Sequence, residues 1–254
     1  MNSPRFHSPS PLSVGACVEL SENAARHAVR VLRLKVGDSV VLFDGRGGEY
    51  SCRISSAGRD TAVVDVLEWR DSERESPVEV TLVQALQAGE KMDLTVQKAV
   101  ELGVTRIVPV ATRRSVLRLE GERARKRVAH WRGVAASACE QCGRNRVPEV
   151  CDIEDLRHWL GTHATATGGL RLMLAPGAEF ALDTLPQPGR HARIELLIGA
   201  EGGFSHDEME QALQAGFVGV RLGPRVLRTE TAGLAALAVI QCLWGDFRGE
   251  AGHV

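Results

Sequence analysis

Aromatic residues are scarce in this chain of 254 residues, which holds 6 Phe, 4 Trp and 1 Tyr. A surface that stacks many nucleic-acid bases on aromatic rings is therefore not expected. Basic residues are not in excess either, because 31 Lys and Arg face 32 Asp and Glu and leave a net charge of −1. Any binding of a polyanion must come from a local basic patch and not from the charge of the whole chain.

Long apolar runs are also missing from the sequence. The longest strongly apolar stretch covers residues 232–240 and ends at Gln241, well short of the roughly 20 residues that cross a bilayer. The first 12 residues contain no apolar segment of the kind found in secretory signals. Six cysteines are too few for a disulfide scaffold in a chain of this size. We therefore expect a cytoplasmic protein with reduced thiols.

The length predicts two domains, and the hydrophobic patterns differ on the two sides of a polar segment at residues 70–77. Short strands with alternating or β-branched apolar residues precede this segment and predict a small β-barrel with one helix at residues 21–34. The predicted strands cover residues 16–20, 39–43, 49–54 and 62–67. We place the domains at residues 1–72 and 77–254.

After Pro77 the sequence alternates between strands and helices. The predicted strands cover residues 78–86, 106–111, 171–175, 195–198 and 218–222. The predicted helices cover residues 90–102, 120–142, 206–215 and 230–247. Such alternation is typical of an α/β domain whose sheet is largely parallel.

A glycine-rich loop, residues 199–205, directly follows the apolar strand at residues 195–198. Ligands of open α/β sheets bind beyond the carboxyl ends of strands, where glycines allow close approach to the backbone. Ser205 and Glu208 have the spacing of a capping box, so the next helix should begin there. The loop is neither a GxGxxG fingerprint nor a P-loop, and a tight strand-to-helix turn is the structural alternative.

A second loop, residues 222–232, follows another short strand and combines a Gly-Pro turn with Arg225 and Arg228. The two arginines could contact a phosphate or a carboxylate. The alternative is a helix cap with solvated arginines.

Basic residues concentrate between positions 112 and 132, where eight arginines and lysines face only Glu120 and Glu122 and give a local charge of +6. A run of one sign repels itself, so contact with RNA or DNA is favoured over a solvated helix face. A smaller cluster lies at residues 26–35. Cys139 and Cys142 form a CxxC, but no second ligand pair accompanies them, which favours helix packing over a zinc site.

Five segments in order resemble the 16S ribosomal RNA uracil N3-methyltransferases. They include the loops Leu197-Ile-Gly-Ala-Glu-Gly-Gly-Phe-Ser205 and Leu222-Gly-Pro-Arg-Val-Leu-Arg-Thr-Glu-Thr-Ala232. The other three are residues 90–104, residues 140–144, and an N-terminal part that contains residues 27–38 and 42–45. The similarity extends from about Arg5 to Phe247. The chain departs from the family pattern at four positions, which are Ala88, Arg113, Cys142 and Ala200.

The resemblance implies a SPOUT-type methyltransferase domain with a trefoil knot, preceded by a PUA-like RNA-binding β-barrel. It implies S-adenosylmethionine as cofactor, a homodimer, 16S rRNA of the small ribosomal subunit as partner, and no membrane or metal. Because uridine N3 carries a proton, an enzyme must favour the loss of this proton as the methyl group arrives. We assign Arg228 to stabilising the developing uridine anion and Glu201 to orienting the cofactor or receiving the proton.

The resemblance implies that residues from three loops contact the cofactor, namely Leu174, Ala175, Gly199, Glu201, Gly202, Gly203, Leu222, Gly223, Leu227 and Thr229. The residues expected to contact RNA are Arg5, Arg30, Arg33, Lys91, Lys98, Arg113, Arg114 and Arg144. Two alternatives stay open at this point. One is a SPOUT enzyme that acts on another RNA site, and the other is a non-catalytic RNA-binding factor of ribosome assembly.

Overall fold

The computed structural model describes residues 3–163, 169–189 and 191–247, and its contacts divide the chain into two compact units. The N-terminal unit comprises residues 1–75 together with residues 136–147. The C-terminal unit comprises residues 76–135 and 148–254. The segment at residues 136–147 therefore packs with a unit from which it is distant in sequence.

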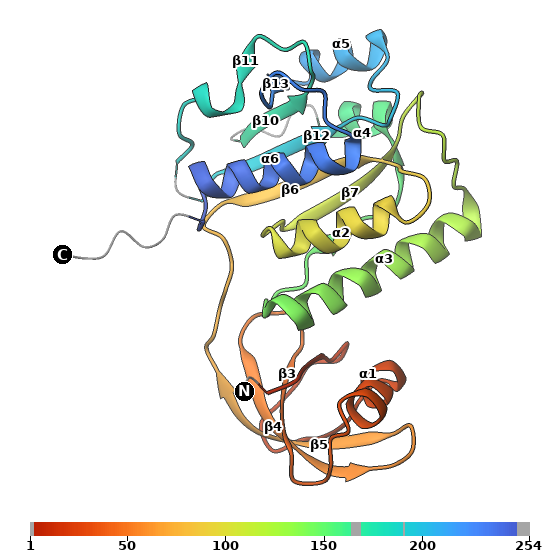
Figure 1. Ribbon diagram of the computed structural model, residues 1–254, viewed down its shortest axis with the longest axis vertical. Coiled ribbons are helices and arrows are strands. Elements are labelled where there is room, and N and C mark those ends of the chain that lie inside the picture. Colours follow the sequence, from red (N-terminus) through yellow and green to blue (C-terminus); the bar gives the residue numbers. More distant parts are fainter. Residues whose placement is uncertain (1–2, 164–168, 190, 248–254) are drawn as a thin grey trace, which may run out of the picture. The chain divides into compact units, whose positions relative to one another are not determined.

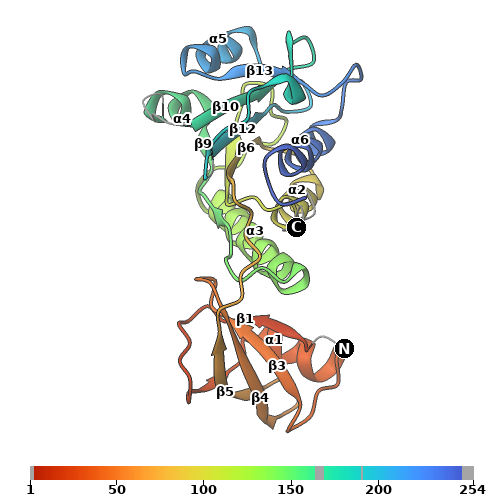
Figure 2. The same ribbon diagram turned by 90° about the vertical axis from the view of Figure 1, so that its left-hand side faces the viewer.

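The N-terminal unit is built on one mixed five-stranded sheet in the order β1-β3-β4-β5-β2. Strand β1 is parallel to β3, and the other neighbours are antiparallel (Figure 2). The strands are β1 (Arg5–His7), β2 (Cys17–Glu19), β3 (Ser39–Phe43), β4 (Glu49–Ala57) and β5 (Ala62–Arg70). The predicted strands are confirmed, whereas the three-residue strand β1 was not predicted from the sequence.

The core of this unit follows from the alternation of apolar residues along the strands. Leu42, Ile54, Val64 and Val66 point to the same buried cluster as Phe6. Helix α1 (Glu22–Arg26) continues as a π-helical turn, η1 (His27–Val31), and contributes Ala24, Ala25 and Ala28 to this core. The predicted helix thus forms, although its second half has π geometry.

An entirely parallel sheet forms the C-terminal unit, in the order β11-β13-β10-β12-β6-β7-β8, with β9 also paired to β7. Its strands are β6 (Glu79–Ala85), β7 (Arg106–Ala111), β8 (Glu149–Val150), β9 (Glu154–Asp155), β10 (Gly169–Leu174), β11 (Phe180–Ala181), β12 (Arg193–Ile198) and β13 (Val218–Arg221). In β12, Leu196, Leu197 and Ile198 are consecutive buried residues, as expected of a strand covered on both faces.

Helices cover both faces of this sheet (Figure 1). Helices α2 (Lys91–Glu101) and α6 (Thr229–Leu243) pack together on one face, and α4 (Leu156–His163) and α5 (His206–Gln214) lie on the other. Helix α3 (Gly121–Cys142) and the short 3₁₀ turn η2 (Leu182–Thr184) complete the elements. The predicted α/β organisation is confirmed. Helix α4 and the two-residue strands β8, β9 and β11 were not predicted.

Strand order decides where a ligand can bind. Strand β12 lies between β10 and β6, two strands that both precede it in the chain. The carboxyl ends of β10, β12 and β13 therefore open on the same edge. The loops after β12 and β13 are the two singled out in the sequence, and the loop after β10 is the one added by the resemblance.

Candidate active site

A cavity of about 500 Å³ opens at the carboxyl ends of β10, β12 and β13. Three loops line it, at residues 174–176, 198–204 and 220–230. Gly203 and Gly223 adopt left-handed backbone angles, with φ of 68° and 66°, which a side chain would strain. The glycines thus let two of the loops turn sharply back over the cavity.

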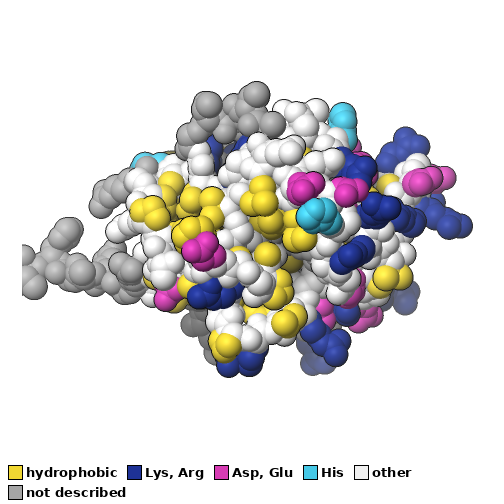
Figure 3. Space-filling model, turned by 90° about the horizontal axis from the view of Figure 1, so that it is seen from above, with side chains coloured by type: hydrophobic (Ala, Val, Ile, Leu, Met, Phe, Trp, Pro, Cys, Tyr) yellow, Lys and Arg dark blue, Asp and Glu magenta, His cyan; other side chains and the backbone are white. Residues whose placement is uncertain are grey.

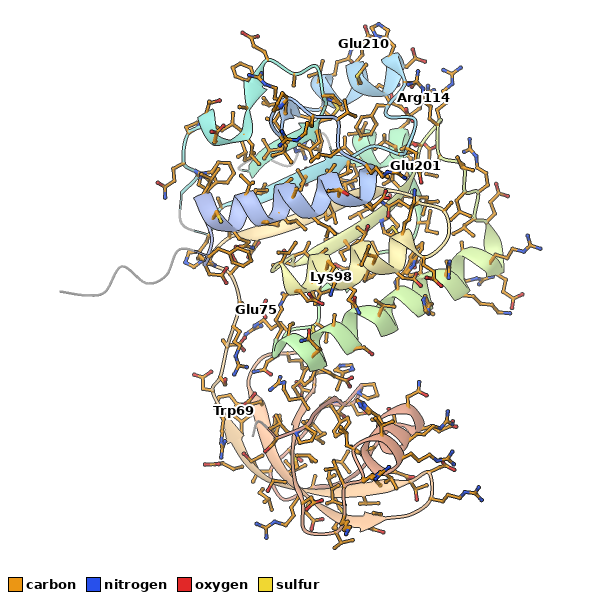
Figure 4. The ribbon with its side chains drawn as sticks, in the orientation of Figure 1. Trp69, Glu75, Lys98, Arg114, Glu201 and Glu210 are labelled. Carbon is orange, nitrogen blue, oxygen red and sulfur yellow. The ribbon has the colours of Figure 1, made fainter. Side chains whose placement is uncertain are left out.

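Nine of the ten residues expected at the cofactor line this one cavity. The exception is Gly202, which lies under the side chain of Arg114. A Cβ atom at Gly202 would come within 3.2 Å of the Cβ of Arg114, and Arg114 Nη1 donates to the Gly202 carbonyl at 2.8 Å. Figure 4 labels Arg114 together with Glu201, the neighbour of Gly202 in this loop. The glycine at 202 therefore accommodates Arg114, a side chain expected to contact RNA.

The end of the glycine-rich loop is fixed by the predicted capping box, which is confirmed. Glu208 accepts from the Ser205 amide at 2.8 Å, and Ser205 Oγ accepts from the Glu208 amide at 3.3 Å. The second carboxylate oxygen of Glu208 accepts from the Arg113 amide at 2.7 Å. A buried glutamate thus ties the loop after β7 to the loop after β12, which holds the rim of the cavity rigid.

Charged side chains at the mouth of the cavity are arranged around Lys91. Its Nζ lies 3.1 Å from Glu201 and 3.6 Å from Glu230. The other carboxylate oxygen of Glu230 is buried without a hydrogen-bond partner among the described residues. Arg228 lies in the same lining and is exposed. Arg221 and Arg225 also line the cavity, so it offers charged groups of both signs and one unused acceptor oxygen to a ligand.

The cavity also includes residues that the sequence did not single out as ligand contacts. Pro176, Phe204, Met209 and Glu230 belong to this set. Lys91 was expected at RNA but lines the cavity. The position of Glu230 in the first turn of α6 was the available signal, because a helix N-terminus that borders a ligand loop directs its side chains into the site.

Figure 3 shows the face that carries β11, β13 and α5, with hydrophobic side chains in the middle and most charged side chains to one side. Val226, one of the exposed apolar residues of the chain, is 77% exposed and also belongs to the cavity lining.

Two of the arginines expected at RNA are engaged inside the N-terminal unit, where Arg144 is buried and Arg5 is partly buried. Arg144 has a side chain that is only 5% exposed, and both Nε and Nη2 donate to Glu75, at 3.1 and 2.5 Å. Arg5 is ion-paired with Glu49 and donates to Asn145 Oδ1 at 2.5 Å. In this arrangement, both guanidinium groups join distant parts of the unit and do not face solvent.

The other expected RNA contacts are on the surface. Arg30 and Lys98 are ion-paired with Asp60 and Glu101, and Arg113 lies 3.2 Å from Asp207. Arg33 is exposed in a left-handed conformation with φ of 56°. Exposed pairs of this kind are weak, so RNA phosphates could compete for these side chains.

The basic stretch lies mostly on α3 and is partly neutralised by neighbours. Lys126 pairs with Glu122 at 2.9 Å, and Arg132 pairs with Asp152 at 3.1 Å. Arg123 and Arg125 are exposed. The stretch therefore stays basic overall, although less so than its sequence suggests.

Cys139 is buried, and this burial raises the pKa of its thiol to about 12. Its Sγ faces the Arg146 carbonyl, which accounts for the CxxC spacing as packing in the N-terminal unit. Among the residues that the structure describes, no group of three His, Cys, Asp or Glu side chains could hold a metal ion. Within the same residues, no helix is long and apolar enough to cross a membrane.

Comparison with known proteins gives the class of protein that this fold and cavity define. Residues 74–241 match the model of an RNA methyltransferase domain, so the chain belongs to this RNA methyltransferase family. Residues 20–67 match a second model, described as an RNA methyltransferase PUA domain.

Individual relatives agree over nearly the whole chain. Ribosomal RNA small subunit methyltransferase E of Buchnera aphidicola is 33% identical over 96% of this chain and 97% of the relative. The enzyme of the same name from Bacillus subtilis is 30% identical over 88% of this chain and 89% of the relative.

Two solved structures are similar in fold as well as in sequence. Ribosomal RNA small subunit methyltransferase E of Neisseria gonorrhoeae, bound to S-adenosylmethionine, is 41% identical with a TM-score of 0.88. A methyltransferase of Legionella pneumophila, in complex with the same cofactor, is 36% identical with a TM-score of 0.90. In both cases the match covers 97% of this chain and 100% of the other.

Proposed function

We propose that this protein transfers a methyl group from S-adenosylmethionine to N3 of a specific uridine in the 16S rRNA of the small ribosomal subunit. The observation that carries the proposal is the single cavity that gathers nine of the ten expected cofactor residues from three separate loops. The names of the relatives support ribosomal RNA of the small subunit as the substrate. The uridine and its N3 come from the resemblance.

The residues of the cavity fit this cofactor. S-adenosylmethionine supplies a methyl group from a positively charged sulfonium. The free oxygen of Glu230 and the carboxylate of Glu201 place negative charge at the mouth of the cavity. Apolar residues from the three loops, including Leu174, Leu222 and Leu227, supply the walls that exclude water.

Arg228 is our candidate for stabilising the uridine as it loses its N3 proton. It lies at the N-cap of α6, and its carbonyl accepts from the amides of Thr231 and Ala232 at 2.9 and 2.8 Å. Its backbone is therefore fixed while its side chain is free to reach O2 or O4 of the base. Because Lys91 engages Glu201, we assign Glu201 to orienting the cofactor.

We propose that RNA binds through the exposed basic residues of both units. Arg30 and Arg33 are the candidates in the N-terminal unit, and Lys98, Arg113 and Arg114 are those in the C-terminal unit. We leave Arg144 out of this set because it is buried, and Arg5 because its partly buried guanidinium is paired with Glu49. Arg114 is the best placed of the five, because its hydrogen bond to Gly202 holds it at the rim of the cavity.

The resemblance further supports a homodimer. A trefoil knot stays a prediction of the same resemblance. A substrate in the ribosome favours a cytoplasmic location.

The test compares Arg228→Ala with Arg193→Ala, an exposed arginine at the amino end of β12. We expect Arg228→Ala to lower methyl transfer to small-subunit RNA by about 100-fold. The dissociation constant for S-adenosylmethionine should change by less than about threefold, because the side chain acts on the base and not on the cofactor. Arg193→Ala should behave as the wild type. Unchanged turnover in Arg228→Ala would reject the catalytic role.

Nucleoside mass spectrometry of ribosomal RNA from cells that lack the protein identifies the product. Loss of 3-methyluridine from 16S rRNA supports the proposal. Loss of a different methylated nucleoside would indicate a methyltransferase for another RNA site. A calorimetric titration that gave no heat with S-adenosylmethionine would indicate a non-catalytic RNA-binding factor.

A further inference from the structure

Four polar side chains are buried together between α2, β6 and the start of α6. They are Gln84, Gln87, Thr95 and Thr229, of which the first three are fully buried and Thr229 is 6% exposed. Buried polar groups destabilise a protein unless they are hydrogen-bonded, so their presence beside the cavity requires an explanation. The proposed chemistry uses neither glutamine and does not use Thr95.

Three of these side chains form a chain of hydrogen bonds that ends on the glycine-rich loop. Thr95 Oγ1 donates to Gln87 Oε1 at 2.9 Å, and Gln87 Nε2 donates to Thr229 Oγ1 at 3.4 Å. Gln84 Nε2 also donates to Thr229 Oγ1, at 3.2 Å. Since both partners of this oxygen are donors, the single hydroxyl proton of Thr229 goes to the Gly199 carbonyl, 2.5 Å away.

This series of hydrogen bonds connects two loops of the cavity. Thr229 begins α6 directly after Arg228, and Gly199 begins the loop after β12. One hydroxyl group therefore joins two of the three loops that line the cavity. Hydrogen bonds in series polarise one another, so the strength of this joint depends on the bond from Thr95.

The same face of α2 makes a second tie to these loops. Lys91 precedes Thr95 by four residues, which places both side chains on one side of the helix. The Nζ of Lys91 lies between Glu201, in the loop after β12, and Glu230, in the first turn of α6. The buried hydrogen bonds from Thr95 and the half-exposed ion pairs of Lys91 thus connect one face of α2 to the same two loops.

We propose that α2 holds the loops of the cavity in their binding conformation and that Gln87 and Thr95 are positioning residues for the cofactor. This inference rests on the proposed function, because it concerns the affinity of the same cavity for S-adenosylmethionine. Neither side chain lines the cavity, so both act through Thr229 and the Gly199 carbonyl. The binding energy of a preorganised site is not reduced by the cost of ordering its loops.

The test is a series at position 95 in the full chain. Thr95→Ser keeps the hydroxyl donor, Thr95→Cys replaces it with a weak donor, and Thr95→Val keeps the shape without any donor. Thr105→Val is the matched control. Thr105 Oγ1 donates to the Val80 carbonyl at a distance of 3.0 Å, and neither residue lines the cavity. Calorimetry with S-adenosylmethionine gives the dissociation constants, and melting without ligand gives the stability of each variant.

We expect Thr95→Ser to bind as the wild type, Thr95→Val to bind about tenfold more weakly, and Thr95→Cys to fall between them. Thr105→Val should lower the melting temperature without a change in affinity. Hydrogen exchange of the amides at residues 199–203 should be faster in Thr95→Val than in the control. If Thr95→Val does not fold, the Cys variant still decides the question.

Equal affinities across the series, whatever the melting temperatures, would overturn the inference and leave Thr95 with a purely structural role. So would an equal loss of affinity in Thr105→Val. Failure of the wild type to bind S-adenosylmethionine would instead refute the proposed function, which distinguishes the two outcomes.

Discussion

Glu75→Gln should destabilise the N-terminal unit, because it removes a charge that is paired with a buried arginine. The Arg144 side chain is 5% exposed and that of Glu75 is 19% exposed, and two hydrogen bonds join them. The substitution keeps the size of the side chain but removes its negative charge. The guanidinium of Arg144 is then left in a site that water hardly reaches.

Breaking a buried pair at one partner typically costs about 3–5 kcal/mol. The exposed edge of Glu75 admits some water, so we expect the lower end of this range, about 3 kcal/mol. For a protein of this size, a loss of that magnitude corresponds to a decrease in Tm on the order of 10 °C. Replacing both partners, as in Glu75→Gln with Arg144→Met, should cost less than the sum of the two single changes.

Differential scanning calorimetry and urea denaturation measure these losses, and a double-mutant cycle isolates the pair. Binding to 16S rRNA is measured in parallel, at a temperature where every variant is folded. Because Arg144 does not face solvent, we expect RNA affinity to change by less than about threefold. A wild-type Tm in Glu75→Gln, together with loss of RNA binding in Arg144→Met, would refute the reasoning and return Arg144 to the RNA surface.

Two further predictions concern the N-terminal unit. We expect Gly37→Ala to lower the free energy of unfolding by roughly 1 kcal/mol and Gly48→Ala to lower it by more, with urea denaturation as the measurement. Both glycines have positive φ, at 67° and 96°, but only at Gly48 would a Cβ lie 2.5 Å from the Trp69 ring, and equal losses would contradict this. Burial raises the pKa of Cys139 to about 12, so the folded state keeps a proton that an unfolded thiol releases near pH 9. The free energy of unfolding should therefore fall between pH 9 and 12, and it should fall less in Cys139→Ala than in the wild type. An identical fall in both proteins would exclude this thiol as a cause.

Much of the fold was predictable because its signals are local. Alternating apolar residues indicated β3, β4 and β5, and an uninterrupted apolar run indicated β12. Two-residue strands such as β8 and β11 carry no such signal, since a period cannot be detected in two residues. They form because a neighbouring strand offers its backbone hydrogen bonds.

The candidate site likewise contains residues that local sequence signals indicated and residues that they did not. Glycines after short apolar strands marked two loops of the cavity, and the family resemblance added the third, at Leu174 and Ala175. The partners of the charged residues were not predictable in this way, because they lie far away in the sequence. Arg144 was expected at RNA, yet its partner Glu75 lies 69 positions away and removes it from the surface.

The sequence by itself determined the alternation of strands and helices, the glycine-rich loops and their capped helix, and the excess of basic residues near α3. Only the tertiary structure decided that β12 lies between β10 and β6, which brings three distant loops to one edge. It also decided that residues 136–147 pack with the N-terminal unit and that hydrogen bonds run from Thr95 through Gln87 and Thr229 to the Gly199 carbonyl. The physical reason is that periodicity and turn chemistry depend on neighbours along the chain, whereas burial and charge pairing depend on neighbours in space.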